Sequence, residues 1–336
     1  MIITRTPLRI SFFGGGTDLP GFAEKYGGAV LSTTIDKYQY ITCRCLMPYW
    51  DYKHQLIYGS KSEMVNEIDE IKHPSIRETM RFFKVDYGLD LHYNTDVPAR
   101  SGMGSSSAFT VGLVNALYGM RGKMPSKRKL AADAIHIEQD LIKEVVGSQD
   151  QVAAAFGGFN YIEFKKGGGF FVHPVTLYRD RREELEEHLV LIFSGFQRFA
   201  TEVEKEKIQH IEERKKTLTR MALMAQEAMH ILVSNEDIRE FGYLLNRAWE
   251  LKKSLSDKVS TGEIDMLYEK GIQNGAIGGK ILGAGGGGFM LFFCEPKNRG
   301  KLLAALKDYL YIPFSFKGNG SQVVYYREED LYDNVR

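Results

Sequence analysis

The sequence predicts an α+β fold of two domains, and three observations support this prediction. The chain has 336 residues, of which 43% are hydrophobic, so it can bury a sizeable core, and its length predicts about two domains. After residue 189 the expected elements follow in the order strand, helices, strand, strand, helix, strand, which is the order of a ferredoxin-like α+β domain. Before that point, residues 89–120 predict a strand, a glycine-rich loop and a helix, a unit suited to holding phosphate groups.

Composition and charge narrow the classes of function. Lys and Arg number 44 against 43 Asp and Glu, a formal charge of +1, so we expect neither a nucleic-acid partner nor an anionic membrane surface. The start, Met-Ile-Ile-Thr-Arg-Thr-Pro-Leu-Arg, does not resemble a signal peptide, and no long apolar run follows. The spacing of Cys43, Cys45 and Cys294 is typical of neither a disulfide framework nor a metal site. We therefore expect a cytoplasmic protein that binds a small molecule.

The first expected element is a strand from Ile2 to Phe13 that runs into Gly14-Gly15-Gly16-Thr17-Asp18. Three glycines allow a backbone shape or a close approach that side chains would prevent, so this turn is a candidate ligand site. Arg9 and Asp18 lie at its two ends, although a surface arginine and a turn-capping aspartate would give the same pattern. The β-branched and aromatic stretch Ala29 to Leu46 then predicts two strands around Asp36-Lys37.

The central loop, Val97 to Ser107, reads Val-Pro-Ala-Arg-Ser-Gly-Met-Gly-Ser-Ser-Ser. A helix is expected from Ala108 to Met120, so the serines lie where free backbone N–H groups gather at its start. Such a loop is suited to binding an anion. An ordinary loop with a serine cap has the same sequence features, so the loop alone leaves both interpretations open.

Two acidic residues follow the loop. Glu138 lies in an expected helix from Leu130 to Val146, where its neighbours at helical spacing are apolar. A carboxylate on such a stripe indicates a buried pair, a position at the edge of the stripe, or a hard cation such as Mg2+. Asp150 begins a short helix after Gly147-Ser148-Gln149, where it would also favour the helix dipole.

The second half begins near the charged stretch Arg179 to Glu187, where we place the domain boundary. A strand is expected at Leu189–Phe193, a long helical region at Thr201–Asp257, strands on both sides of Gly283 to Gly288, and a final strand at Gln322–Tyr326. The spacing Gly283, Gly285, Gly288 satisfies G-x-G-x-x-G, but a β-rich run follows it instead of a helix, which excludes a dinucleotide fold. Walker A and protein-kinase motifs are absent from the sequence.

Three segments in this order resemble the GHMP small-molecule kinases, the superfamily of galactokinase and mevalonate kinase. They are Arg5 to Asp18, Pro98 to Ser107 and Lys280 to Gly288. The resemblance implies a ribosomal S5-like N-terminal domain at residues 1–185 and a ferredoxin-like C-terminal domain at residues 186–336, with ATP and Mg2+ as cofactors.

The resemblance also implies roles for individual residues. Asp150 matches the catalytic aspartate, Arg9 the arginine that assists the attacking hydroxyl, and Glu138 with Ser105 or Ser106 the metal ligands. Nucleotide-binding residues are expected at Pro98, Arg100, Ser101, Gly102, Met103, Gly104, Ser105, Ser106, Ser107, Gly285 and Gly286. Sugar-binding residues are expected at Gly15, Gly16, Thr17, Asp18 and Arg198.

Within the superfamily, Gly14-Gly-Gly-Thr-Asp-Leu-Pro with Gly27-Gly28-Ala29-Val30-Leu31 resembles the D-glycero-α-D-manno-heptose 7-phosphate kinases. These enzymes phosphorylate the anomeric hydroxyl and feed the synthesis of nucleotide-activated heptose. Fucokinase-like and galactokinase-like enzymes, and a silent sensor of sugar and nucleotide, remain the alternatives. The sequence does not indicate an oligomeric state.

Overall fold

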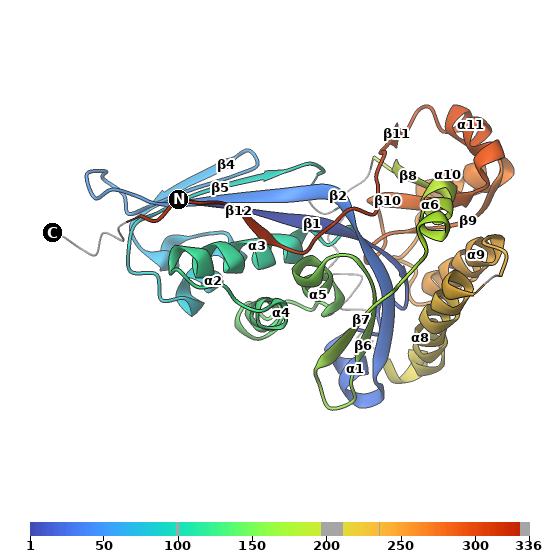
Figure 1. Ribbon diagram of the computed structural model, residues 1–336, viewed down its shortest axis with the longest axis horizontal. Helices are drawn as coiled ribbons and strands as arrows, with labels where there is room; N and C mark the ends of the chain where they lie inside the picture. The colour runs from blue at the N-terminus through green and yellow to red at the C-terminus, as the bar shows by residue number, and fades with distance from the viewer. Residues whose placement is uncertain (99–100, 196–210, 235, 330–336) are drawn as a thin grey trace.

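The first sheet forms the body of the N-terminal half. The computed structural model describes residues 1–98, 101–195, 211–234 and 236–329. Six strands pair in the order β12-β1-β2-β5-β3-β4, and β6 and β7 extend the sheet from one end of β2 (Figure 1). Every pair is antiparallel except β3 with β5. The bounds are β1 Ile2–Phe13, β2 Gly28–Cys45, β3 His54–Tyr58, β4 Lys61–Val65, β5 Leu89–Thr95, β6 Phe159–Phe164, β7 Phe170–Pro174 and β12 Gln322–Tyr326.

Strand β2 is continuous, so the prediction of two strands around Asp36-Lys37 was wrong. Its first half pairs with β6 and its second half with β5. The register against β1 shifts where Thr34 lies opposite Arg9 and Tyr38 opposite Pro7, so the extra residues form a bulge. The carboxylate of Asp36 accepts hydrogen bonds from Ser315, which holds the bulge in place. Residues 35–37, where two strands were expected to meet, therefore form a bulge within one strand. The end of β1, beyond this bulge, contacts the second half of the chain.

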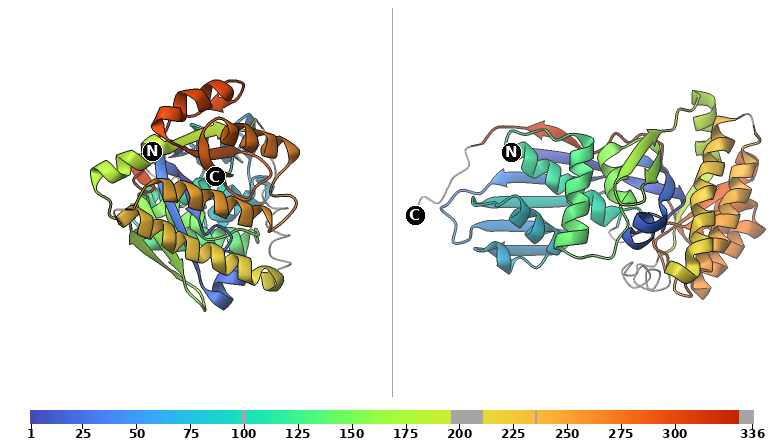
Figure 2. Two further views of the ribbon diagram at one scale, coloured as in Figure 1. Left: turned by 90° about the vertical axis from the view of Figure 1, so that its right-hand side faces the viewer. Right: turned by 90° about the horizontal axis from the view of Figure 1, so that it is seen from below.

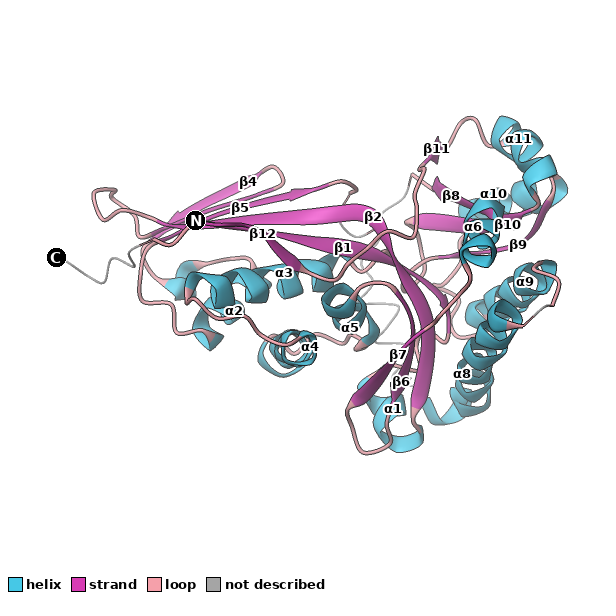
Figure 3. Cartoon of the chain, viewed as in Figure 1, coloured by secondary structure: helices cyan, strands magenta, loops and turns pink. Residues whose placement is uncertain are grey.

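Helices cover one face of the first sheet (Figures 1 and 3). They are α2 Pro74–Phe82, α3 Ser105–Met120, α4 Lys127–His136 and α5 Gln149–Phe156, while α1 Pro20–Tyr26 and the short turn η1 Ile68–Glu70 lie in connections. Helix α3 is almost entirely buried, as its apolar sequence requires. The helix expected to reach Val146 ends earlier, because α4 passes into a π turn, η2 Ile137–Leu141, and the backbone leaves the helix at Lys143 with φ 61°.

The second sheet has the strand order β11-β8-β10-β9, with all pairs antiparallel. Its strands are β8 Leu189–Phe193, β9 Ala276–Ile281, β10 Phe289–Cys294 and β11 Leu310–Tyr311. The helices of this half are α6 Arg179–His188, α8 Ile211–Val233, α9 Arg239–Lys253, α10 Gly262–Gln273 and α11 Pro296–Ala305. This order confirms the predicted ferredoxin-like arrangement and the α+β class.

The final strand was assigned to the wrong sheet. Gln322–Tyr326 forms a strand, but β12 pairs with β1 in the first sheet, and the short β11 is the fourth strand of the second sheet. The connecting chain runs back along the first sheet, where Thr34 bonds Gly318. We propose that the two domains meet near residue 186, before β8, with the end of the chain returning to the first domain.

One hydrophobic core extends across both halves, and a second lies within the C-terminal half. Phe12 and Phe13 at the end of β1 contact Phe241 of α9 edge to face, and Phe241 contacts Phe293 of β10. Figure 1 and the right view of Figure 2 show the two halves side by side along the long axis, with α8 and α9 at one end of the first sheet. None of the helices in the described part of the chain is both long and apolar enough to cross a membrane. Because Phe12 and Phe13 contact α9, the end of β1 lies at the junction of the halves, where the expected site residues gather.

Candidate active site

The turn Gly14 to Asp18 is shaped by its glycines. A Cβ on Gly14, whose φ is 82°, would overlap the carbonyl oxygen of Ala29. Thr17 is fully buried and its hydroxyl donates to the carbonyl oxygen of Gly14. Thr17 was expected to bind sugar, but this contact gives it the role of closing the turn, which holds Asp18 in a fixed position.

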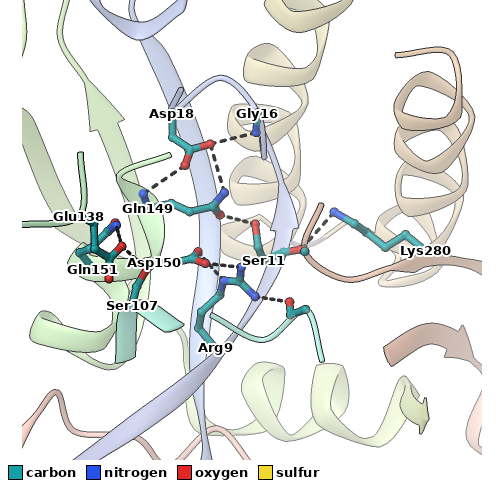
Figure 4. Close-up of polar contacts among 12 residues, drawn as sticks. Arg9, Ser11, Gly16, Asp18, Ser107, Glu138, Gln149, Asp150, Gln151 and Lys280 are labelled. Atoms are coloured by element: carbon teal, nitrogen blue, oxygen red, sulfur yellow. Dashed lines mark hydrogen bonds and ion pairs between the residues drawn. The ribbon is translucent and has the colours of Figure 1, made fainter. Parts of the chain in front are cut away.

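Arg9 and Asp150 form a bidentate ion pair (Figure 4). Nε and Nη2 of Arg9 each lie 2.8 Å from a carboxylate oxygen of Asp150, and Nη1 donates to the carbonyl oxygen of Gly102 at 2.5 Å. The Arg9 side chain is 5% exposed and that of Asp150 is 22% exposed. The carboxylate is thus fixed by a buried cation while part of it stays open to a ligand.

Asp18 lies next to this pair in a separate network. Its carboxylate accepts hydrogen bonds from the backbone N–H of Gly16 at 2.9 Å, from the backbone N–H of Gln149 at 3.2 Å and from Nε2 of Gln149 at 3.1 Å. Burial, followed by the negative charge of Asp150, raises the pKa of Asp18. Gly147 is required here, because a Cβ would overlap the Asp18 carboxylate.

Glu138 is fully buried and projects from the π turn toward α3 and α5. Its Oε2 accepts from Oγ of Ser107 at 2.8 Å and from Nε2 of Gln151 at 2.5 Å, while Oε1 is buried and has no well-formed hydrogen bond; the Thr110 hydroxyl also lies close to this carboxylate and favours its charged form. Burial raises its pKa from 4.5 to about 7. A buried carboxylate oxygen without a well-formed hydrogen bond is costly unless a ligand with positive charge completes it.

The central loop brings these groups to the start of α3. Gly102 and Gly104 have φ values of 84° and 72°, and a Cβ on Gly104 would lie 3.2 Å from Oδ2 of Asp150. Because the first N–H groups of a helix lack intrahelical partners, the start of α3 next to Asp150 is suited to binding an anion.

The late glycine loop packs against the central loop. The backbone N–H of Phe289 donates to the carbonyl oxygen of Ser101, and a Cβ on Gly102 would lie 2.5 Å from the carbonyl oxygen of Leu282. Two buried lysines brace the chain next to this contact, Lys252 at the start of the late loop and Lys280 between β9 and the end of β1. Nζ of Lys252 donates to the carbonyl oxygens of Ile281 and Gly283, and Nζ of Lys280 donates to those of Ser11 and Phe12.

The structure thus gathers Arg9, Asp18, Glu138 and Asp150 around the central loop, but some expected positions differ. The serine that contacts Glu138 is Ser107. Ser105, the expected metal ligand, is buried and its backbone carbonyl accepts a hydrogen bond from Gln39, while Ser106, the other candidate, is exposed. Pro98 is exposed, whereas Ser101 and Met103 are buried. Arg100 and Arg198 lie outside the described residues.

Sequence reasoning assigned no role to Gln149, Gln151, Lys252 or Lys280. Gln149 and Gln151 flank Asp150, and Lys280 begins the late segment of the family resemblance, so these three had a signal in the sequence. Lys252 gave no signal, because its partners are backbone carbonyl groups distant in the sequence.

The residues around Glu138 fit a magnesium ion, since Mg2+ prefers oxygen ligands and Oε1 of Glu138 is buried without a well-formed hydrogen bond. Among the residues that the structure describes, no group of three or more His, Cys, Asp or Glu side chains is arranged to hold a metal. The remaining ligands of such an ion would therefore be hydroxyl, phosphate and water oxygens, which is usual for Mg2+ bound with a nucleotide.

A known protein family matches parts of both halves of the chain. The GHMP kinases N terminal domain matches residues 72–158, and GHMP kinases C terminal matches residues 226–312. The chain is 34% identical over 331 residues to D-glycero-alpha-D-manno-heptose 7-phosphate kinase of Campylobacter jejuni, covering 95% of this chain and 97% of that protein. It is 26% identical to a bifunctional fucokinase/GDP-fucose pyrophosphorylase of Arabidopsis thaliana, over 88% of this chain and 30% of that longer protein.

Among solved structures, a D-glycero-D-manno-heptose 1-phosphate kinase from Bacteroides thetaiotaomicron superimposes with a TM-score of 0.78 at 26% identity. The superposition covers 97% of this chain and 100% of that one. A putative sugar kinase from Campylobacter jejuni superimposes with a TM-score of 0.68 at 29% identity, covering 96% and 97%.

Proposed function

This chain belongs to the GHMP kinases, and we propose that it transfers the terminal phosphate of ATP to the anomeric C1 hydroxyl of D-glycero-α-D-manno-heptose 7-phosphate. The product would be the 1,7-bisphosphate, which feeds the synthesis of nucleotide-activated heptose. The observation that carries the proposal is the Arg9–Asp150 pair at the start of α3, because it joins a fixed carboxylate to an anion-binding helix terminus. The choice of heptose is supported by the identity of 34% to a heptose 7-phosphate kinase over 95% of the chain.

In this proposal Asp150 accepts the proton of the C1 hydroxyl, and the oxygen of that hydroxyl attacks the terminal phosphorus of ATP. The new O–P bond forms at C1, the bond between the β,γ-bridging oxygen and the γ-phosphorus breaks, and ADP leaves. Arg9 holds both oxygens of Asp150 and places positive charge beside the attacking oxygen. Since proton transfer to a positioned base contributes about 10²- to 10⁴-fold, much of the remaining acceleration would come from positioning and electrostatics.

The nucleotide would bind where the central and late loops meet. The N–H groups at the start of α3 and the glycine backbones of residues 102, 104, 285 and 286 would face the phosphates. Glu138 and Ser107 would hold Mg2+, so we propose Ser107 in place of Ser105. When bound, Mg2+ supplies charge neutralisation for the phosphate oxygens.

We also propose a cytoplasmic location, where ATP is available. Cys43, Cys45 and Cys294 are buried and form no disulfide, as in proteins of a reducing compartment.

The test is a screen of ADP release with heptose 7-phosphate, mannose, fucose and galactose, each with and without Mg2+. We expect the highest kcat/KM with heptose 7-phosphate and no turnover without Mg2+. Preference for fucose or galactose would support the alternative of another GHMP sugar kinase, and binding without ADP release would support a silent sensor.

A further inference from the structure

Ser11, Gln149 and Asp18 form a chain of hydrogen bonds beside the Arg9–Asp150 pair (Figure 4). Oγ of Ser11 donates to Oε1 of Gln149 at 2.7 Å, and Nε2 of Gln149 donates to Oδ1 of Asp18 at 3.1 Å. Gln149 thus connects a strand residue to the glycine turn. The mechanism proposed above leaves Gln149 without a role.

Burial separates the three members of this chain. Asp18 is 2% exposed and Ser11 is 4% exposed, whereas Gln149 is half-buried. The Asp18 carboxylate already accepts three N–H groups, of about four that a carboxylate can accept. Gln149 is therefore the member of this chain best placed to meet a ligand.

The two buried neighbours also fix the direction of the Gln149 amide. A carboxylate only accepts hydrogen bonds, so the amide nitrogen must face Asp18, and the amide oxygen then faces the Ser11 hydroxyl. One N–H and one oxygen lone pair of the amide remain for a ligand. A sugar hydroxyl, which both donates and accepts, matches this pair of groups.

The surroundings place this amide next to the reaction. Gln149 precedes Asp150 in the first turn of α5, so a ligand that contacts the amide lies beside the proposed base. Gly15 borders the amide, because a Cβ there would lie 3.6 Å from Nε2 of Gln149 and 3.7 Å from Oγ of Ser11. The missing side chain at Gly15 keeps that side of the amide uncovered.

We propose that Gln149 is a specificity-determining residue that binds one hydroxyl of the sugar, and that Ser11 and Asp18 are positioning residues for its amide. This inference rests on the proposed sugar kinase activity. It differs from the role that the family resemblance implies, in which Asp18 itself bonds the sugar.

The test combines Gln149→Leu with a set of deoxy analogues of the best sugar, each lacking one hydroxyl. In the wild-type enzyme, we expect removal of the contacted hydroxyl to lower kcat/KM by about tenfold or more. In Gln149→Leu, removal of that same hydroxyl should no longer lower kcat/KM. The decreases caused by removing the other hydroxyls, and the KM for ATP, should stay within about twofold of their wild-type values. Gln55→Leu is the matched control, since Gln55 is also half-buried and hydrogen-bonded but lies on β3.

Equal penalties for every analogue in the wild type and in Gln149→Leu would overturn the role of Gln149 and leave the kinase activity in place. A wild-type enzyme that phosphorylates none of the sugars would instead overturn the proposed function, and this inference with it.

Gly15→Ala provides a second test that does not depend on the folding of Gln149→Leu. Its methyl group makes ordinary contacts with Gln149 and Ser11, and the backbone there does not require glycine. We expect a sugar KM raised about tenfold or more with little change in the KM for ATP. Gly300→Ala, where a methyl group meets no neighbour within 4 Å, is the control. An unchanged sugar KM in Gly15→Ala would contradict the placement of the sugar against Gln149.

Discussion

Replacing Glu138 with glutamine should stabilise the metal-free protein at neutral pH. Burial raises the pKa of Glu138 from 4.5 in the unfolded chain to about 7 in the folded protein, a difference of about 2.5. At about 1.36 kcal/mol for each pKa unit, this is about 3 kcal/mol. Because the folded state binds the proton more tightly, the folded protein is favoured at low pH. The contribution of Glu138 protonation to the free energy of unfolding is lost as the pH rises from 4.5 to about 7. Above pH 7 no further loss is expected.

The glutamine variant has no proton to lose at position 138. The free energy of unfolding of Glu138→Gln minus that of the wild type should therefore grow by about 3 kcal/mol from below pH 5 to above pH 7. Urea unfolding of both proteins at pH 4, 5, 6, 7 and 8 with EDTA measures this difference. Glu240→Gln, which changes an exposed side chain, is the control and should show little pH-dependent difference from the wild type.

The same variant should lose nearly all turnover with ATP and Mg2+, because the amide lacks the charge that would bind the metal. Parallel stability curves for wild type and Glu138→Gln across this pH range would refute the buried, proton-binding state of Glu138. Retained turnover would refute its role as a metal ligand.

Three further variants test other parts of the site. Asp150→Asn should lower kcat by about 10²- to 10⁴-fold with the KM for ATP within about twofold, and steady-state kinetics showing an unchanged kcat would remove Asp150 as the base. Arg9→Lys loses the bidentate contact and should lower kcat more than it changes either KM, and a kcat equal to the wild type would contradict the positioning role. Gly102→Ala places a methyl group 2.5 Å from the carbonyl oxygen of Leu282 and should raise the KM for ATP by about tenfold or more. Its control is Gly168→Ala, where φ is also positive but nothing lies within 4 Å, and equal effects of the two variants would show that backbone strain alone is responsible.

Local sequence patterns predicted the helices and strands better than they predicted which strands pair with one another. The strand, glycine loop and helix at residues 89–120 depend on neighbours in sequence, and the structure has β5 and α3 there. The pairing of β12 with β1 depends on residues more than 300 positions apart, which no local pattern encodes. The bulge at Asp36 likewise depends on Ser315, which is distant in the sequence.

In the site, too, local patterns predicted individual residues but not their contacts with residues distant in the sequence. The carboxylate of Glu138 interrupts an apolar stripe, and this pattern indicated a special role. Glu138 is fully buried in the structure. Its contact with Ser107 depends on a π turn, which periodicity does not predict. Gln149 looked like an ordinary helix residue, because its partners Ser11 and Asp18 are 138 and 131 positions away.

Phosphorus NMR of a reaction with ATP, Mg2+ and heptose 7-phosphate shows which hydroxyl of the sugar this kinase phosphorylates. We expect a new phosphate signal coupled to the anomeric proton, formed in step with ADP and formed far more slowly with Asp150→Asn. A phosphate on any other carbon, or ADP formed with no new sugar phosphate, would contradict the proposed function.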